Sequence, residues 1–179
     1  MVTRVAVVTG ANRGIGFDIC RQLARRGDIR VVLTSRDQTK GKAAVKKLAD
    51  EGLQVDCHRL DVTDVRGVAA IVAYLEKEYE RADILVNNAG IMIDPKGSRV
   101  LTSVIENYRL TLDTNFFGPL RLCQALVPLM RKNGHGRIVN ISSGQGQLSD
   151  MGAGTPAYRI SKAALNALTC VLAAELQGS

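Results

Sequence analysis

VAVVTGANRGIG at residues 5–16 decides the fold. It joins a run of apolar, β-branched residues to a glycine-rich loop and then to the start of a helical pattern. Gly10, Gly14 and Gly16 allow a tight turn, leave room for a pyrophosphate beside the backbone, and let the helix pack close to the strand with its first N–H groups facing the anion. A glycine-rich loop alone is ordinary turn chemistry, but this one lies between the first strand and the first helix and therefore predicts a nucleotide site.

Apolar runs rich in Val, Ile and Leu alternate with helical patterns along the rest of the chain. The predicted strands are 4–9, 30–35, 54–61, 82–88 and 136–142, and the predicted helices are 14–26, 39–51, 65–79, 101–112, 114–132 and 157–177. Such runs are typical of parallel strands buried on both faces, and the alternation predicts an α/β, Rossmann-type, doubly wound parallel sheet in three α/β/α layers. The helix caps predicted from residue type are Gly27, Gly52 and Gly134 at C-termini and Asp64 and Thr114 at N-termini.

Length and composition indicate one globular domain over residues 1–179, since 46% of the residues are hydrophobic and two domains would be small. The four cysteines show no CxxC spacing and the N-terminus lacks a signal-peptide pattern, so we expect a reduced, cytoplasmic setting. No apolar run approaches the roughly 18–20 residues of a membrane span.

The net charge of +7 is spread along a chain with only 4% aromatic residues, which argues against a nucleic-acid surface. A positive field of this kind favours a polyanionic small molecule such as a phosphorylated cofactor. His58 and His135 have no further ligands at metal spacing, and we expect no metal site.

AYRISKAAL at residues 157–165 contains a possible proton-transfer pair. On a helix, Tyr158 and Lys162 are four residues apart and share one face, and an ammonium near a phenol favours its deprotonated form. Such a tyrosine can give a proton to a carbonyl oxygen or take one from an alcohol. The same spacing occurs by chance on many solvated helices, so the pair alone decides nothing.

Five elements now stand in one order: TGANRGIG at 9–16, NNAG at 87–90, Asn115, ISS at 141–143, and Tyr158 with Lys162. Together they resemble the short-chain dehydrogenase/reductase family over essentially the whole chain. The gaps between the loop glycines are three residues and then one, as in this family and unlike G-x-G-x-x-G. VVLTSRD and LVNNAGI resemble its carbonyl-reductase branch.

The resemblance implies a catalytic set of Asn115, Ser143, Tyr158 and Lys162. Tyr158 would be the acid in reduction, Lys162 would assist it and bind the nicotinamide ribose, Ser143 would bind the substrate oxygen, and Asn115 would help to hold a relay water. Ser142 and Ser143 could instead start a turn, and Asn115 could be a local cap near Thr114. Ser143 is expected at the end of the fifth strand.

The resemblance also implies a cofactor set shared between the loops at the carboxyl ends of the strands. Its residues are Gly10, Asn12, Arg13, Gly14, Ile15, Gly16, Ser35, Arg36, Asp61, Val62, Asn88, Ala89 and Gly90, together with Tyr158 and Lys162. Asp61 would contact the adenine with the Val62 backbone alongside, or would be only a turn residue. Asn87 and its neighbours would also brace the central strand.

NADP(H) is the expected cofactor. An NAD site usually places an acid after the second strand, whereas here Arg36 follows Ser35 and the first acid is Asp37. Arg36 has a forked donor set suited to a 2′-phosphate, and Arg13 lies where NADP-preferring family members often carry a basic residue.

The expected activity is reduction of a ketone or aldehyde. The alternatives are a 3-oxoacyl reductase, an alcohol dehydrogenase, or an NADP(H)-binding sensor or scaffold that lacks a complete substrate site. Family members usually run past the Tyr/Lys helix, so we expect that C-terminal strands are missing. The short interval from Ser143 to Tyr158 has no room for the shielding insertion of monomeric carbonyl reductases, which predicts a homodimer or homotetramer through helices 114–132 and 157–177.

Overall fold

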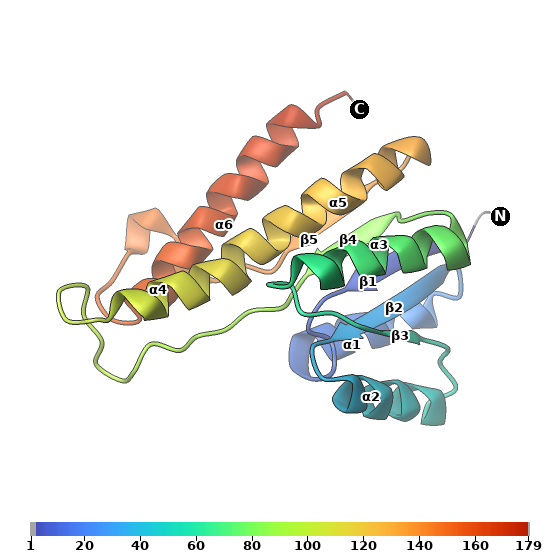
Figure 1. Ribbon diagram of the computed structural model, residues 1–179, viewed down its shortest axis with the longest axis horizontal. Coiled ribbons are helices and arrows are strands. Elements are labelled where there is room, and N and C mark those ends of the chain that lie inside the picture. The colour runs from blue at the N-terminus through green and yellow to red at the C-terminus, as the bar shows by residue number, and fades with distance from the viewer. Residues whose placement is uncertain (1–2, 179) are drawn as a thin grey trace. The chain divides into compact units, whose positions relative to one another are not determined.

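The computed structural model describes residues 3–178. The elements, in chain order (Figure 1), are β1 (Arg4–Val8), α1 (Gly14–Arg25), β2 (Ile29–Ser35), α2 (Gln38–Asp50), β3 (Asp56–Arg59), α3 (Val65–Tyr79), β4 (Ile84–Asn87), α4 (Ile105–Leu112), η1 (Asp113–Phe117), α5 (Gly118–Lys132), β5 (Arg137–Asn140), η2 (Gly144–Gly146), η3 (Leu148–Asp150) and α6 (Pro156–Glu175). Every predicted strand is present, and each is shorter than or close to its predicted range. The predicted alternation of strands and helices is confirmed.

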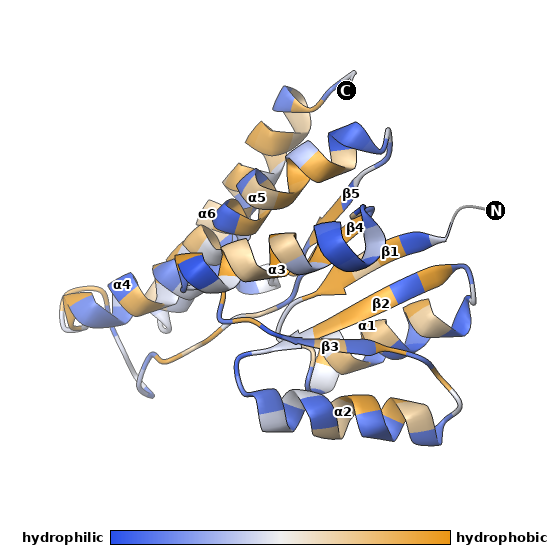
Figure 2. Cartoon of the chain, turned by 45° about the vertical axis from the view of Figure 1, so that its right-hand side comes forward, coloured by the Kyte–Doolittle hydropathy of each residue, from blue (hydrophilic) through white to orange (hydrophobic). Residues whose placement is uncertain are grey.

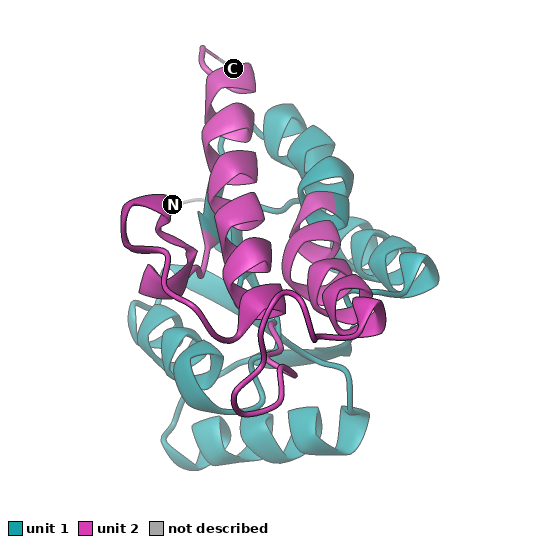
Figure 3. Ribbon diagram, turned by 90° about the vertical axis from the view of Figure 1, so that its left-hand side faces the viewer, with its two compact units in different colours: residues 1–89, 121–139 teal, residues 90–120, 140–179 magenta. Residues whose placement is uncertain are grey.

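The chain divides into two compact units, shown in separate colours in Figure 3. The first contains the described residues up to Ala89 together with Arg121–Val139, and the second contains Gly90–Leu120 and Asn140 onwards. The single domain predicted over residues 1–179 stays a prediction. None of the helices within residues 3–178 has the length and apolar character needed to cross a membrane.

The first unit is built on a sheet with the strand order β3-β2-β1-β4-β5. β1 pairs in parallel with β2 and with β4, and β2 pairs in parallel with β3. The residues Val5–Val8 of β1 are buried, and β1 and β2 are largely apolar (Figure 2), as expected for strands covered on both faces. α1 and α2 lie on one side of the sheet, and α3 lies on the other (Figure 1).

The strand order reverses at β1, because the chain passes from β1 to β2 on one side and returns to β4 on the other. In open α/β sheets the crevice outside the carboxyl ends of the strands at such a point is where ligands bind. The loop that follows β1 and the residues that follow β4 therefore occupy the expected ligand edge of the first unit.

The opposite, amino edge of this sheet is held by the fully buried carboxylate of Asp83. Its Oδ2 accepts hydrogen bonds from the Val5 N–H at 2.8 Å and from Arg81 Nε at 2.7 Å, and its Oδ1 accepts from Arg81 Nη2 at 2.6 Å. The Arg137 N–H donates to the Asp83 carbonyl at 2.8 Å. Burial alone raises the pKa of Asp83, but Arg81 and the Val5 N–H outweigh it and leave the pKa below 3.8. Asp83 thus joins β1, β4 and β5.

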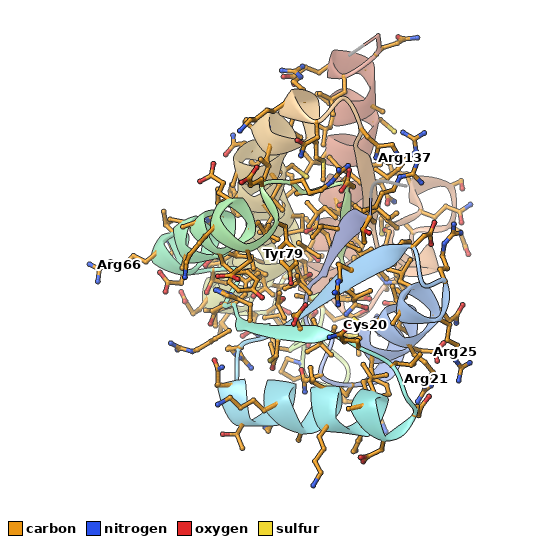
Figure 4. The ribbon with its side chains drawn as sticks, turned by 90° about the vertical axis from the view of Figure 1, so that its right-hand side faces the viewer. Cys20, Arg21, Arg25, Arg66, Tyr79 and Arg137 are labelled. Carbon is orange, nitrogen blue, oxygen red and sulfur yellow. The ribbon has the colours of Figure 1, made fainter. Side chains whose placement is uncertain are left out.

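Helix α3 is fixed to the edge strand β3 by a polar and aromatic cluster. The hydroxyl of Tyr79, labelled in Figure 4, donates to Asp56 Oδ2 at 2.6 Å. The ring of Tyr74 lies 5.0 Å from the ring of His58, centroid to centroid. Burial lowers the pKa of His58, because its charged form loses solvation there.

The predicted C-terminal caps are confirmed, because Gly27, Gly52 and Gly134 all have positive φ angles. Asp64 is the N-cap of α3, as predicted, and accepts a hydrogen bond from the Arg66 N–H at 2.9 Å.

In the second unit, α4 begins at Ile105, four residues later than predicted, and continues directly into the π-helical segment η1 and then into the first residues of α5. The prediction of an N-cap at Thr114 is wrong. Thr114 lies inside η1, and the residues on both sides of η1 keep right-handed helical angles, so no helix starts there and no N–H group needs a cap.

Candidate functional site

The turn after β1 has the shape expected of a phosphate-binding loop. Gly10 has a φ of 61°, and a Cβ atom added to it would lie only 2.9 Å from the Cα of Ala89. A Cβ atom on Gly16 would collide with the Asn88 amide and lie 2.9 Å from the Cα of Ala11. Side chains are therefore excluded at both glycines, because Ala89, Asn88 and Ala11 occupy the space beside them.

The remaining loop residues of the predicted cofactor set are Asn12, Arg13, Gly14 and Ile15. Arg13 is the exposed N-cap residue of α1 and makes no capping side-chain hydrogen bond. Ile15, in the first turn of that helix, is 64% exposed. A cationic and an apolar side chain thus flank the helix N-terminus on its exposed side.

Thr9 joins this turn to the end of β4. Its hydroxyl oxygen accepts hydrogen bonds from the N–H groups of Asn88 at 3.0 Å and Ala89 at 2.9 Å. In return, Asn88 Nδ2 donates to the carbonyls of Thr9 at 2.8 Å and Gly10 at 3.2 Å. The predicted bracing role of the Asn-Asn segment is present. Thr9 was not among the predicted site residues, although its place before the first loop glycine was a usable signal.

The end of β2 carries the predicted 2′-phosphate residues. Ser35 is buried, and Arg36 follows it as an exposed side chain. The nearest acid, Asp37, is engaged at the start of α2, where its Oδ1 accepts from the Lys40 N–H at 3.1 Å. This bond holds the pKa of Asp37 below its usual value. The carboxylate is therefore used by the helix.

Arg59 is a second arginine near the end of β2, and the sequence analysis did not include it in the cofactor set. It is paired with Ser35 across β2 and β3, and its Nε donates to the Arg36 carbonyl at 3.3 Å. The only sequence signal was its place at the end of a predicted strand, two residues before Asp61.

Asp61 has a local hydrogen-bonding partner. Its Oδ1 accepts from the Thr63 N–H at 3.0 Å and from the Thr63 hydroxyl at 2.8 Å. The turn role considered for Asp61 is thus present, with Val62 buried beside it. An adenine contact by either residue stays a prediction.

In the second unit, α6 presents Tyr158 and Lys162 together, as the four-residue spacing predicts. Lys162 Nζ lies 5.7 Å from the centroid of the Tyr158 ring. Lys162 is buried, with only 4% of its surface exposed, and its Nζ donates to the Ile141 carbonyl at 2.6 Å. Burial lowers the pKa of Lys162 below 10.5 because the ammonium loses solvation.

Asn115 is fully buried and makes three side-chain hydrogen bonds. Its Oδ1 accepts from the Ile91 N–H at 2.8 Å, and its Nδ2 donates to the Ile91 carbonyl at 2.8 Å and to Ser161 Oγ at 3.0 Å. Asn115 is therefore not a local cap. Both hydrogens of its amide are occupied, so its side chain fixes protein groups.

Gly90 lies beside this residue and beside Lys162. A Cβ atom on Gly90 would lie 3.3 Å from Asn115 Oδ1 and 3.7 Å from Lys162 Nζ. The structure therefore brings three of the predicted residues together within the second unit.

Ser143 is not at the end of β5, as the sequence analysis expected, because the strand ends at Asn140. It is instead the N-cap of η2, where its Oγ accepts from the Gln145 N–H at 3.2 Å. The η2 turn packs on α6, since a Cβ atom on Gly146 would lie 2.7 Å from the Cβ of Lys162. A hydroxyl that accepts one bond still has a proton to donate, so Ser143 keeps the capacity to bind a substrate oxygen.

Asp94 is a further site residue that the sequence did not reveal. Its two carboxylate oxygens accept from the N–H groups of Ala157 at 3.1 Å and Tyr158 at 2.9 Å. The acid is 63 and 64 residues away from these groups in sequence, and no local motif connects them.

The chain is similar to proteins of a known family. A family model described as "short chain dehydrogenase" matches residues 4–179. Carbonyl reductase [NADPH] 3 of Mus musculus is 48% identical over 147 residues, which cover 80% of this chain and 50% of the relative. (+)-Neomenthol dehydrogenase of Arabidopsis thaliana is 43% identical over 168 residues, which cover 83% and 56%. The chain spans about half the length of these curated relatives.

Solved structures give the same result. A metagenomic short-chain oxidoreductase in complex with NADP matches with a TM-score of 0.88 and 36% identity, covering 99% of this chain and 78% of that chain. An actinorhodin polyketide ketoreductase with NADPH matches with a TM-score of 0.88 and 33% identity, covering 97% and 65%. On the family match and these likenesses, the chain belongs to the short-chain dehydrogenase family.

Proposed function

We propose that this protein reduces a ketone or aldehyde to the alcohol with NADPH, in a reversible hydride transfer. The observation that carries the proposal is the pairing on α6, where the buried Lys162 ammonium lies 5.7 Å from the Tyr158 ring centroid. The relatives named carbonyl reductase [NADPH] support the reaction and the cofactor.

Each of the four predicted catalytic residues has a defined task in this proposal. The Tyr158 hydroxyl gives its proton to the carbonyl oxygen during reduction and takes it back during oxidation. Lys162 places a positive charge 5.7 Å from the centroid of the Tyr158 ring, where it can stabilise negative charge that develops on the phenol oxygen during proton transfer. Ser143 donates a hydrogen bond to the substrate oxygen, and Asn115 holds the neighbouring backbone in place. The nicotinamide supplies the hydride when bound.

The first unit offers a fitting cradle for NADP(H). Gly10 and Gly16 let the turn pack closely against Ala89 and Asn88, and the first N–H groups of α1 can then bind a pyrophosphate. The forked guanidinium of Arg36 suits a 2′-phosphate, and Arg13 adds positive charge. We include Arg59 in this set, because it is hydrogen-bonded to the Arg36 carbonyl.

The test is NADPH consumption with a panel of ketones and aldehydes, measured for the wild type and for Tyr158→Phe. Loss of the acid should reduce turnover by about 10²–10⁴-fold. Tyr74→Phe, a matched change on α3, should leave turnover near the wild-type rate. Equal rates for Tyr158→Phe and the wild type would refute the assigned acid. If fluorescence titration shows tight NADPH binding but no carbonyl is turned over, the protein is better described as a cofactor-binding sensor.

We also propose that the protein forms a homodimer or homotetramer through α5 and α6. Two apolar side chains of α6 support this, since Ile160 is 43% and Val171 is 64% exposed. Sedimentation analysis should show a species of at least two chains, and Val171→Glu should shift it towards the monomer because a charge would have to be desolvated. A wild-type protein that sediments as a monomer at all concentrations would rule this out.

A further inference from the structure

The helix that carries Tyr158 and Lys162 is capped by a residue from a distant loop. Its own N-cap residue, Thr155, has a left-handed backbone with a φ of 43° and makes no capping side-chain hydrogen bond. The Thr155 hydroxyl is turned to another partner, Gln145 Oε1, at 2.8 Å. The start of α6 therefore depends on a group from outside the helix.

That group is the carboxylate of Asp94. The first N–H groups of any helix have no partner within it, and here Pro156 has no N–H, which leaves those of Ala157 and Tyr158. Asp94 Oδ1 accepts the first of these at 3.1 Å and Oδ2 accepts the second at 2.9 Å. A negative charge is also favourable at the positive end of the helix dipole. One of the two bonds is made to the backbone of Tyr158 itself.

The segment that carries Asp94 is held firmly on its other side. Three residues earlier, the Ile91 N–H donates to Asn115 Oδ1, and the Ile91 carbonyl accepts from Asn115 Nδ2. Asn115 also donates to Ser161 Oγ at 3.0 Å, and Ser161 in turn donates to the Tyr158 carbonyl at 2.7 Å. The segment 90–94 is thus tied to α6 at two points, and both lead to the backbone of Tyr158.

We infer that Asp94 is a positioning residue that fixes the backbone of Tyr158, and with it the direction of the phenol. It acts through the helix N-terminus and does not take part in proton transfer. Its consequence for catalysis rests on the proposed function, whereas its structural action on the two N–H groups does not.

The structural part is tested by residue-resolved amide hydrogen exchange. In Asp94→Ala the amides of Ala157 and Tyr158 lose their only hydrogen-bond acceptors in the described structure and should exchange about 3- to 30-fold faster, as for loss of a helix cap. Asp94→Asn keeps one acceptor oxygen and should retain part of the protection. Amides deep in α6, and all amides of the control Asp150→Ala, should be unchanged. Wild-type exchange at Tyr158 in Asp94→Ala would overturn the inference.

The catalytic part is tested by steady-state kinetics on the same variants, with rates normalised to the folded fraction. Asp94→Ala should lower kcat by roughly tenfold or more, because small misplacements of a catalytic group are costly. KM for the carbonyl and Kd for NADPH should stay within about twofold, and Asp94→Asn should recover part of kcat. A uniform loss of binding and turnover, or no recovery in Asp94→Asn, would contradict the positioning role. If the wild type reduces no carbonyl, the proposed function fails while the exchange result still decides the role of Asp94.

Discussion

Replacing Asn115 by alanine removes the acceptor of the Ile91 N–H and one donor to the Ile91 carbonyl. A buried backbone group that loses its partner costs about 1–3 kcal/mol. Asn115 is fully buried but Ile91 is half-buried, so water can restore part of this loss. We therefore expect the free energy of unfolding to fall by about 2–3 kcal/mol, which corresponds to roughly 4–12 °C in Tm for a chain of this size.

The assay is urea unfolding followed by circular dichroism, with thermal melting as a second measurement. Asn166→Ala is the matched control, because Asn166 lies on α6 in the same unit and its amide makes one hydrogen bond within residues 3–178, to the Gly146 carbonyl at 3.2 Å. This control should cost less than about 1 kcal/mol. A loss for Asn115→Ala no larger than for Asn166→Ala would refute the structural role deduced from the three hydrogen bonds.

Asn115→Asp tests the same contacts in a second way. It keeps an acceptor for the Ile91 N–H but places a carboxylate oxygen against the Ile91 carbonyl, where the amide now donates. Because two acceptors would then face each other, this variant should be at least as unstable as the alanine variant. Stability close to that of the wild type would mean that the Ile91 contacts matter little.

The remaining predictions concern the first unit. Asp83→Ala should lower the free energy of unfolding by about 3–5 kcal/mol, because it leaves Arg81 without its buried partner. Urea unfolding measures this loss, and a loss below about 1 kcal/mol would contradict the prediction. The pKa of His58 is lowered from 6.5, so the unfolded chain binds more protons just below that pH and stability should fall as the pH drops from 6.5. Melting curves of His58→Phe should lack this part of the pH dependence, and identical pH profiles would count against it. Gly10→Ala should weaken NADPH binding roughly tenfold, because alanine at this positive φ strains the backbone by about 1–3 kcal/mol. Fluorescence titration measures the affinity, and an unchanged affinity would contradict the prediction.

The sequence predicted the strands, helices and glycine turn because their signals are local. The run from Val5 to Val8, the glycines that follow and the spacing of Tyr158 and Lys162 each act within a few residues of the chain. A parallel α/β sheet then places the ends of β1 and β4 at one edge without further information.

Contacts between distant residues were not predictable in the same way. Asn115 was expected either in a proton relay or as a local cap, and its partners turned out to be the backbone of Ile91 and the side chain of Ser161. Asp94 gives no local signal at all, since its partners lie more than sixty residues later. Ser143 was expected at the end of the fifth strand because Ile141 extends the apolar pattern, whereas β5 ends at Asn140.

The bonds between Thr9 and Asn88 have a consequence for protein engineering. Because each residue bonds the backbone of the other, and because Asn88 fills the space over Gly16, the turn after β1 and the end of β4 form one interlocked part. A designer who grafts the glycine loop from a related protein must therefore transplant both segments together. A graft of the loop alone would mismatch the hydrogen bonds between Thr9 and Asn88 and disturb the end of β4 as well as the turn.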